Sequence, residues 1–342
     1  MRKKFCLLLI GLIVMFILTG CSGSKEQQSG QEGSNEEPKI ERADLIFSGA
    51  NPGGGGDWDL MGAGVAEAVR RGTDGAIGIT LIPGEGVSNP VTVSESKADI
   101  AFSHNVVATS AVLGIEPYDT EYSNLKAIGA LYSGPAQFIV PENSKIQKIA
   151  DIKENKIPIQ IAVDNPGSVM ELTNRRMLAE YGITYEDIES WGGKIIYKGF
   201  GEAADLMKDG KIDVFSTMAM APSGAVQELA ITNKLRMLDF GDIYQTMSEK
   251  YGYMPFSIPK DSYEFLTGDV QSFATWIILL VRDDMPEDVA YNITKSLGEN
   301  LEYLKTVHSN LKPLTPEMMA ANAGIDLHPG ALKYYQEVGA VK

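Results

Sequence analysis

Short apolar runs alternate with helical periodicity along most of the chain. Runs rich in Val, Ile, Leu and Phe recur from residue 43 onward, and their composition and length predict strands. These runs cover residues 43–47, 77–82, 99–102, 125–131, 138–140, 159–163, 194–197, 212–216 and 273–281. Apolar residues at three- and four-residue spacing predict helices over residues 60–69, 106–113, 170–178, 203–207 and 225–231. Strands and helices that alternate in this way predict βαβ units, mainly parallel sheets and an α/β fold.

The N-terminal segment departs from this alternation. Three basic residues at positions 2–4 precede an apolar run over residues 5–18, and Cys21 follows in the sequence Leu-Thr-Gly-Cys, which resembles a bacterial lipoprotein cleavage box. We therefore expect residues 1–20 to be a signal peptide and Cys21 to carry lipid, which anchors an extracytoplasmic protein to the cell membrane. The alternative is a plain membrane anchor, but the apolar run is shorter than the roughly 20 residues that a spanning helix needs.

The segment that follows Cys21 is polar. Residues 22–41 are rich in Ser, Gly, Gln and Glu, with Ile40 as their one apolar side chain, so residues 21–41 predict a flexible linker. The chain has two cysteines, Cys6 in the predicted signal peptide and Cys21. The predicted folded part therefore has no cysteine, which excludes disulfides, Cys-ligated metals and thiol catalysis there.

Size and charge limit the partners. A chain of 342 residues is long for one compact domain, which favours two lobes. The formal net charge of −15, with acids and bases interleaved, argues against nucleic acid and gives no reason to expect attraction to an anionic membrane surface. An anionic ligand would need local dipoles, such as helix N-termini.

Glycine-rich and polar turns follow several predicted strands, where ligands bind in open α/β sheets. The first turn spans residues 51–59 and lacks the Gly-Lys-Ser/Thr ending of a phosphate-binding loop. Its glycines allow a ligand to approach the backbone closely, although a flexible surface loop is the simpler alternative. Its candidate ligand-binding residues are Gly54, Gly55, Gly56, Asp57 and Trp58.

Four further turns supply the remaining candidates. They contribute Ser88 and Asn89; Ser103, His104 and Asn105; Gly167 and Ser168; and Ala219 and Pro222. Ser88 and Ser168 each precede a predicted helix, so a simple capping role explains them as well as ligand binding does. His104 has a structural and a functional interpretation of equal weight. Arg175 and Arg176, two turns into the helix after Ser168, are expected to be solvated at the surface.

The sequence gives little support for catalysis, cofactors or metals. Residues 86–90 lack the closing glycine of G-x-S-x-G, and the three histidines have no metal-ligand spacing. Residues 199–204 fit the dinucleotide pattern G-x-G-x-x-A, but an ordinary glycine turn before a helix explains them, and an exported protein has little access to NAD. Asp57 and Asp59 are too few carboxylates for calcium. We therefore predict no catalytic residue, no cofactor and no metal.

Several short motifs together resemble the TAXI family, the extracytoplasmic solute receptors of TRAP transporters. The resemblance extends from about residue 43 to 340 and depends on the order of the motifs. They are Gly86-Val-Ser-Asn89, Ala98-Asp-Ile-Ala-Phe-Ser-His-Asn105, Ile149-Ala-Asp-Ile152, Pro166-Gly-Ser168, Leu206-Met-Lys-Asp-Gly-Lys-Ile-Asp213 and Leu327-His-Pro-Gly-Ala-Leu-Lys-Tyr-Tyr335. The resemblance implies a type II periplasmic-binding-protein fold, in which two α/β lobes surround a central ligand cleft. It also implies binding of a small carboxylate, glutamate-like or a di- or tricarboxylate, and delivery to TRAP membrane subunits.

One departure from the TAXI pattern leaves the ligand open. The family usually has aromatic residues after its first glycine-rich turn, whereas residues 52–59 read Pro-Gly-Gly-Gly-Gly-Asp-Trp-Asp, closer to the related tricarboxylate receptors. We expect lobe 1 to comprise residues 42–138 and 270–342 and lobe 2 to comprise residues 139–269. Two alternatives remain, a sensing or adhesion lipoprotein without a transport role and, with less support, an exported hydrolase.

Overall fold

The computed structural model describes residues 42–49, 57–241 and 243–342, and these belong to one compact unit. The predicted signal peptide, Cys21, the linker over residues 21–41 and Gly54, Gly55 and Gly56 lie outside the described residues. Within the described ranges, no helix is both long enough and apolar enough to cross a membrane.

The strands form one hydrogen-bonded sheet with two parallel ends. The order of eight strands is β2 (Ile77–Ile82), β1 (Ala43–Ser48), β3 (Ile100–His104), β10 (Val270–Arg282), β4 (Leu125–Pro141), β7 (Val214–Met218), β5 (Gln160–Ala162) and β6 (Lys194–Ile196). In addition, β8 (Leu235–Leu238) pairs with β4 and β9 (Met254–Ile258) pairs with β10. The α/β prediction is confirmed, but "mainly parallel" holds only at the two ends, because β4 and β10 are antiparallel to their neighbours.

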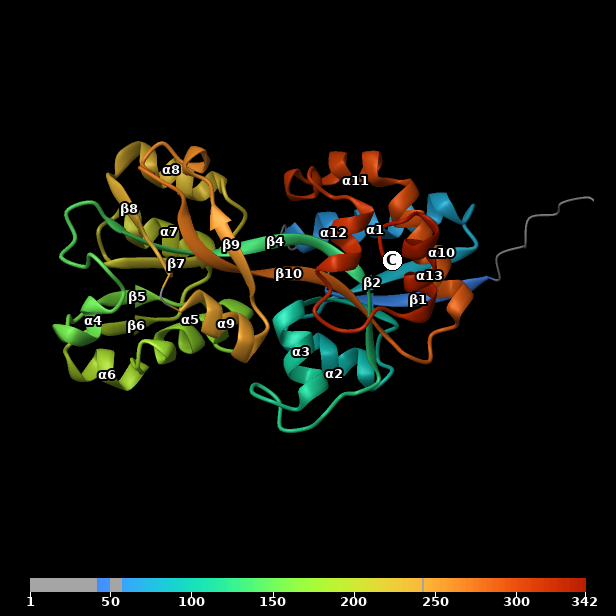
Figure 1. Ribbon diagram of the computed structural model, residues 1–342, viewed down its shortest axis with the longest axis horizontal. Helices are drawn as coiled ribbons and strands as arrows, with labels where there is room; N and C mark the ends of the chain where they lie inside the picture. The colour runs from blue at the N-terminus through green and yellow to red at the C-terminus, as the bar shows by residue number, and fades with distance from the viewer. Residues whose placement is uncertain (1–41, 50–56, 242) are drawn as a thin grey trace, which may run out of the picture. The chain divides into compact units, whose positions relative to one another are not determined.

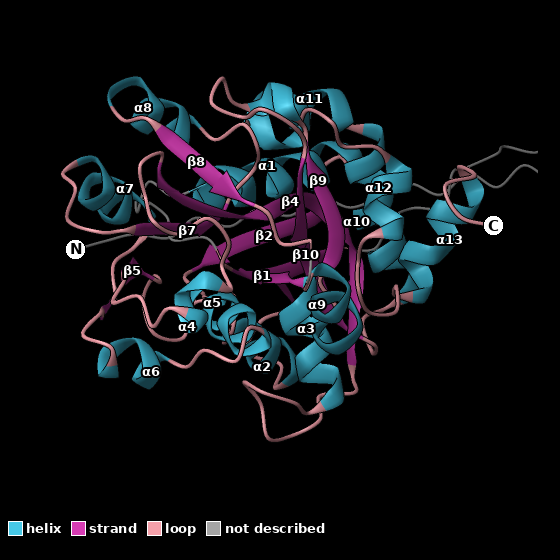
Figure 2. Cartoon of the chain, turned by 60° about the vertical axis from the view of Figure 1, so that its left-hand side comes forward, coloured by secondary structure: helices cyan, strands magenta, loops and turns pink. Residues whose placement is uncertain are grey.

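The helices form two groups, on the left and on the right of Figure 1, and we name these groups after the predicted lobes. Lobe 1 contains α1 (Asp57–Gly72), α2 (Asn89–Ser94), α3 (Asn105–Leu113), α10 (Glu287–Glu299), α11 (Leu301–Val307), α12 (Pro316–Ala321) and α13 (Pro329–Glu337) with β1 to β3. Lobe 2 contains α4 (Asp151–Glu154), α5 (Val169–Glu180), α6 (Tyr185–Ser190), α7 (Phe200–Lys208), α8 (Gly224–Thr232) and α9 (Tyr244–Tyr251) with β5 to β9. Figure 2 shows helices lying outside the strands in both groups.

The long strands β4 and β10 belong to both lobes. The first part of β4 pairs with β10 as far as Pro135, and from Ala136 onward it pairs with β7 and β8. The sequence predicted two strands here, whereas the structure has one strand of 17 residues. Gly134 and Pro135 interrupt the apolar pattern, but pairing with β10 keeps the chain extended. The lobe boundaries at residues 138–139 and 269–270 stay predictions.

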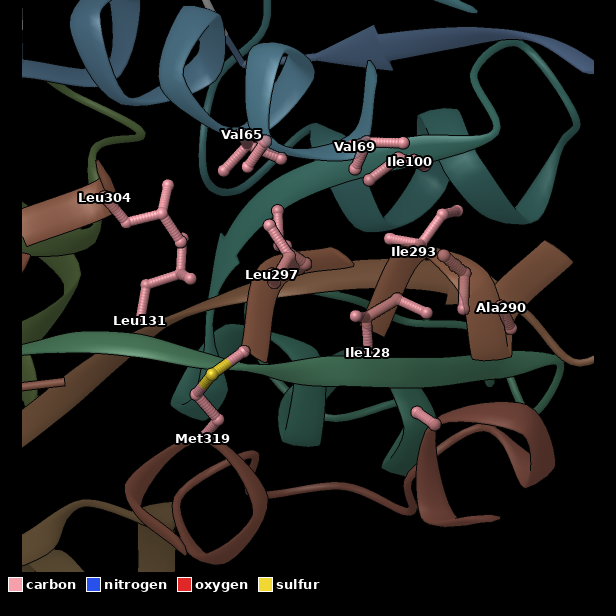
Figure 3. Close-up of a cluster of buried hydrophobic side chains, with 14 of the residues drawn as sticks. Val65, Val69, Ile100, Ile128, Leu131, Ala290, Ile293, Leu297, Leu304 and Met319 are labelled. Atoms are coloured by element: carbon pink, nitrogen blue, oxygen red, sulfur yellow. The ribbon is translucent and has the colours of Figure 1, made fainter. Parts of the chain in front are cut away.

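The core of lobe 1 lies between α1, α10 and the sheet. Val65 and Val69 are one helical turn apart on α1 and face the apolar side of α10, which carries Ile293 and Leu297 (Figure 3). All four side chains have no exposed surface. The same cluster contains Phe47 near the end of β1 and Phe102 of β3, and Trp58 at the start of α1 packs against it.

Candidate functional site

Two predicted site residues of lobe 1, Trp58 and His104, lie near Gly86, and so does Val169 of lobe 2, which follows the predicted Ser168. A Cβ atom placed on Gly86 would be 3.1 Å from Val169 Cγ2 of lobe 2, 3.2 Å from His104 Cδ2 and 3.5 Å from Trp58 Cη2. The rings of Trp58 and His104 are 6.0 Å apart between centroids. We call Trp58, Gly86, His104 and Val169 the interlobe site.

The strand ends explain why these residues meet. In lobe 1, β1 pairs in parallel with β2 and β3, so the three strands end at the same edge of the sheet, where the first three turns begin. In lobe 2, β5 pairs in parallel with β7, which brings the turn with Gly167 and the turn with Ala219 and Pro222 to a common edge. The three predicted turns of lobe 1 therefore share one edge, and so do the two predicted turns of lobe 2, as expected for a ligand site in an α/β sheet.

Two longer helices begin at the interlobe site, one from each lobe. α3 begins directly after His104, and α5 begins directly after Ser168. Ser168 Oγ accepts a hydrogen bond from Glu171 N at 3.1 Å, so the capping prediction for Ser168 is confirmed. The His104 side chain makes no capping bond to α3. The first N–H groups of α3 therefore have no side-chain cap from His104.

Of the two interpretations of Ser88, ligand binding and helix capping, the structure does not support capping. Ser88 occupies the N-cap position of α2, but its side chain makes no capping bond. Its hydroxyl instead donates to the Glu85 carbonyl at 3.2 Å. Its backbone explains this, because φ −81° and ψ −25° are already helical, whereas capping residues usually have extended dihedrals.

Two of the predicted ligand residues are bonded within the protein framework. Asn89 is fully buried, donates from Nδ2 to the Phe102 carbonyl at 2.7 Å and accepts from Ser48 Oγ at 2.9 Å. Ser103, also fully buried, donates from Oγ to the Gly86 carbonyl at 3.0 Å. These bonds join the ends of β1 and β3 to the turn that contains Gly86. Direct ligand contact by Asn89 and Ser103 stays a prediction.

Asn105 connects three parts of the fold. Its Oδ1 accepts hydrogen bonds from Thr275 Oγ1 and from Trp276 N, both at 2.8 Å. Its Nδ2 donates to the Gly252 carbonyl of lobe 2 at 3.3 Å. Thr275 and Trp276 both belong to β10, the strand that enters lobe 1 from lobe 2. Asn105 therefore connects the start of α3 to that strand. Ligand contact by Asn105 is likewise untested.

His104 is held as a neutral imidazole. Burial lowers the pKa of His104 to about 3. Its Nδ1 atom is buried and has no hydrogen-bond partner among the residues that the structure describes. A neutral imidazole offers one donor and one acceptor and no charge. His104 can therefore orient a ligand by a hydrogen bond but does not supply a cation.

Trp58 adds an aromatic surface. Its Nε1 donates to the Tyr132 hydroxyl at 3.2 Å, and its ring lies 5.2 Å from that of Phe102 between centroids. The ring is only partly buried, and it packs against the lobe 1 core. Asp57 begins α1 one residue earlier.

The lobe 2 turns differ in how tightly they are held. Gly167 has φ +82° and open space where a Cβ atom would lie. The Ala219 carbonyl accepts from Gln137 Nε2 at 2.8 Å, and Pro222 is exposed. Asp164 precedes the turn that contains Gly167. Burial raises the pKa of its carboxyl group, which accepts a hydrogen bond from Asn165 N at 2.7 Å.

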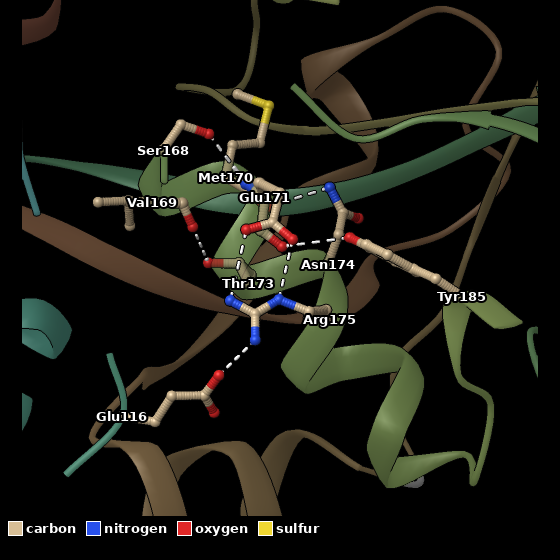
Figure 4. A network of polar contacts seen from close by, with 9 residues as sticks. All are labelled: Glu116, Ser168, Val169, Met170, Glu171, Thr173, Asn174, Arg175 and Tyr185. Atoms are coloured by element: carbon tan, nitrogen blue, oxygen red, sulfur yellow. Dashed lines mark hydrogen bonds and ion pairs between the residues drawn. The ribbon is translucent and has the colours of Figure 1, made fainter. Parts of the chain in front are cut away.

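The surface prediction for Arg176 is wrong. Arg176 is only 3% exposed, whereas the Arg175 side chain is 42% exposed and paired with Glu171 (Figure 4). Val169, Thr173 and Arg176 are spaced by four and three residues, so they share one face of α5. That spacing was the signal in the sequence that could have indicated burial of Arg176. It was overlooked because an arginine is usually solvated.

Residues 50–339 match the NMT1-like family. The structure is similar to a TctC solute-binding protein from Polaromonas, at 15% identity and a TM-score of 0.52, covering 87% of this chain and 98% of that one. It is also similar to a binding-protein component of an ABC phosphonate transporter from Pseudomonas aeruginosa, at 12% identity and a TM-score of 0.51, covering 79% of this chain and 80% of that one. These likenesses show the fold predicted from the sequence, the two-lobed α/β fold of periplasmic binding proteins.

Proposed function

Because the chain belongs to the NMT1-like family and has the periplasmic-binding-protein fold, we propose that it is an extracytoplasmic solute receptor. It binds a small solute between its lobes and delivers it to a membrane transporter. The two similar structures described above are binding proteins by name and not enzymes, which supports a role without catalysis.

One observation carries the proposal: helices from opposite lobes begin at the same place. Val169, the first residue of α5, and His104, which directly precedes α3, both lie against Gly86. A ligand held there contacts both lobes only when they meet. Binding therefore shifts the population toward the closed state, which a transporter can recognise.

The proposed ligand is a small carboxylate. Each helix N-terminus stabilises an anion by about 0.3–1 kcal/mol, and by more in a sheltered site. His104, neutral at physiological pH, adds a hydrogen bond without adding charge. The candidates are a glutamate-like amino acid or a di- or tricarboxylate. Phosphonates are the competing class, because one similar structure belongs to a phosphonate transporter.

The transporter and the anchor are the finer parts of the proposal. The TAXI-like motifs support a TRAP-type transporter as the partner. The Leu-Thr-Gly-Cys21 sequence supports lipid attachment after removal of residues 1–20, with residues 21–41 as the linker. The receptor would then act at the outer side of the cell membrane.

Ligand-dependent thermal unfolding tests the proposal. Residues 40–342 form a compact unit, and this chain is unfolded and refolded to remove carried-over ligand before the measurement. It is then heated with amino acids, di- and tricarboxylates, and methylphosphonate. A ligand that binds only the native state stabilises it by about 2.7 kcal/mol at a hundred times Kd. We expect one carboxylate to raise Tm.

The variant His104→Ala separates binding from general stabilisation. It removes the hydrogen-bonding ring from the interlobe site, so we expect a smaller ligand-induced shift in Tm. A shift with methylphosphonate alone would replace the carboxylate proposal by a phosphonate receptor. A flat panel would reject both ligand classes and favour a sensing or adhesion lipoprotein.

A further inference from the structure

We propose that Arg175 and Arg176 of α5, together with Glu116 of lobe 1, form an interlobe latch that sets how readily the lobes close. Glu116 favours the contact between lobes, and the buried charge of Arg176 opposes it. The inference deepens the proposed function, on which it rests, because closure of the lobes controls ligand affinity in a receptor.

The favourable part is an ion pair between the lobes. Arg175 Nη1 pairs with Glu116 Oε1, which lies in the segment between α3 and β4 of lobe 1 (Figure 4). Arg175 Nε also pairs with Glu171 Oε1 at 2.9 Å within α5. Glu171 is nearly buried, with 7% of its side chain exposed, so it holds the guanidinium in place on lobe 2. The partner on lobe 1 is 59% exposed and is hydrated when the lobes separate.

The part of the latch that opposes closure of the lobes is the guanidinium of Arg176. Its Nη2 donates to Ser110 Oγ of α3 at 3.0 Å and to the Glu116 carbonyl, so it too contacts lobe 1. Its Nε and Nη1 atoms are buried without a hydrogen-bond partner among the described residues. A cation whose donors are only partly bonded is costly to remove from water. The guanidinium also lies over the Tyr251 ring of lobe 2, 4.8 Å from the ring centroid. In the proposed latch, separation of the lobes hydrates the two unbonded nitrogens, so their burial disfavours closure.

The latch is joined to the interlobe site by one helix face. Val169 meets lobe 1 at Gly86, and Arg176, seven residues along the same face, meets lobe 1 again at Ser110. Between them, Thr173 Oγ1 and the buried Tyr253 hydroxyl are 2.7 Å apart. The backbone hydrogen bonds of a helix make it move as a unit, so a ligand that keeps Val169 against lobe 1 also keeps Arg175 and Arg176 at Glu116.

The two parts predict opposite effects on closure. Glu116→Gln removes the ion pair and keeps the carbonyl, so the closed fraction falls and Kd rises about twofold to fivefold. Arg176→Met removes the buried charge and fills a similar volume, so the closed fraction rises and Kd falls about threefold to tenfold. Glu202→Gln is the matched control, because Glu202 pairs with Lys198 within lobe 2 at 2.9 Å. It should change neither quantity.

Single-molecule energy transfer between the lobes measures closure without any ligand. Residues 40–342 contain no cysteine, so Lys145→Cys in lobe 2 and Lys312→Cys in lobe 1 provide two exposed labelling positions. The inter-dye distance should increase in Glu116→Gln, decrease in Arg176→Met and stay constant in Glu202→Gln. If Arg176→Met does not fold, Arg176→Gln replaces it; it removes the buried charge and keeps a polar side chain, and the inter-dye distance should again decrease.

The outcomes separate the latch from the proposed function. Unchanged distances in all folded variants would overturn the latch, whether or not the ligand panel gives binding. An increased distance in Arg176→Met would also overturn it, because the arginine would then simply hold the lobes together. Opposite shifts with a flat ligand panel would support the latch and reject the solute-receptor proposal.

Discussion

At the scale of single residues, the fold controls the charge state of His104. Burial lowers the pKa of His104 to about 3, compared with about 6.5 in an unfolded chain. Below pH 6.5 the unfolded chain therefore binds a proton at this site that the folded protein does not. Protonation of the unfolded chain lowers the free energy of unfolding. The stability is therefore fully present above pH 6.5 and is lost as the pH falls toward 3.

We expect His104→Gln to be less sensitive to acid than the unchanged protein. Between pH 7.5 and pH 5.0, neutral His104 accounts for a loss of about 1–2 kcal/mol in the free energy of unfolding. Urea unfolding of both proteins at the two pH values measures the difference. His328, whose pKa burial also lowers, is present in both and cancels. Equal losses in the two proteins would mean that His104 titrates normally.

Two serines in equivalent positions test the capping of α5. Ser168→Ala removes the acceptor of the Glu171 N–H group and should reduce the free energy of unfolding by about 1 kcal/mol. Ser88→Ala is the matched control, since Ser88 is the N-cap residue of α2 but makes no capping bond. It should cost less than about 0.5 kcal/mol. Chemical unfolding at pH 7.5 compares them, and equal costs would contradict the assignment of the cap.

At the scale of elements, the closest approach of the lobes at the interlobe site depends on Gly86. A Cβ atom there would lie 3.1 Å from Val169 Cγ2, tighter than ordinary contact, and the backbone φ is not in the left-handed region. Gly86→Ala should therefore fold normally but push α5 away from lobe 1. We expect weaker ligand binding with little change in the urea midpoint without ligand. Calorimetric titration with the ligand from the thermal panel measures this, and unchanged affinity would show that the contact adjusts freely.

The local hydrophobic pattern predicted a helix or strand well where the whole element lies in one environment. The strand predicted over residues 77–82 coincides with β2, Ile77–Ile82, and the helix predicted over residues 170–178 lies within α5, Val169–Glu180. The pattern failed for β4, because a strand that passes from one lobe to the other is held by β10 through Gly134 and Pro135. Such pairing between distant segments leaves no local periodicity.

The candidate site was predictable to the level of turns and not of atoms. The turns after β3 and β5 both reach the turn after β2, because His104 and Val169 lie near Gly86. However, the sequence did not distinguish Ser168, which caps a helix, from Ser88, which does not. It also gave no sign that Asn89 is bonded to Phe102 and Ser48, because those partners depend on how β1 and β3 align.

At the scale of the whole molecule, the net charge and the local field at the site have opposite effects on an anionic ligand. The chain carries a formal charge of −15, which repels a carboxylate at a distance, whereas the starts of α3 and α5 attract it only at short range. Salt screens the distant repulsion, with a Debye length of about 30 Å at 0.01 M and about 8 Å at 0.15 M. We therefore expect the association rate constant to rise severalfold over this range.

Stopped-flow tryptophan fluorescence, to which Trp58 in the interlobe site contributes, measures that rate against salt concentration. The dissociation rate constant should change less, because a ligand enclosed between the lobes is screened less than one in solution. His104→Ala should retain the same salt dependence, since it removes no charge at pH 7.5. An association rate that falls with added salt would show instead that a local positive field at the site outweighs the negative charge of the rest of the protein.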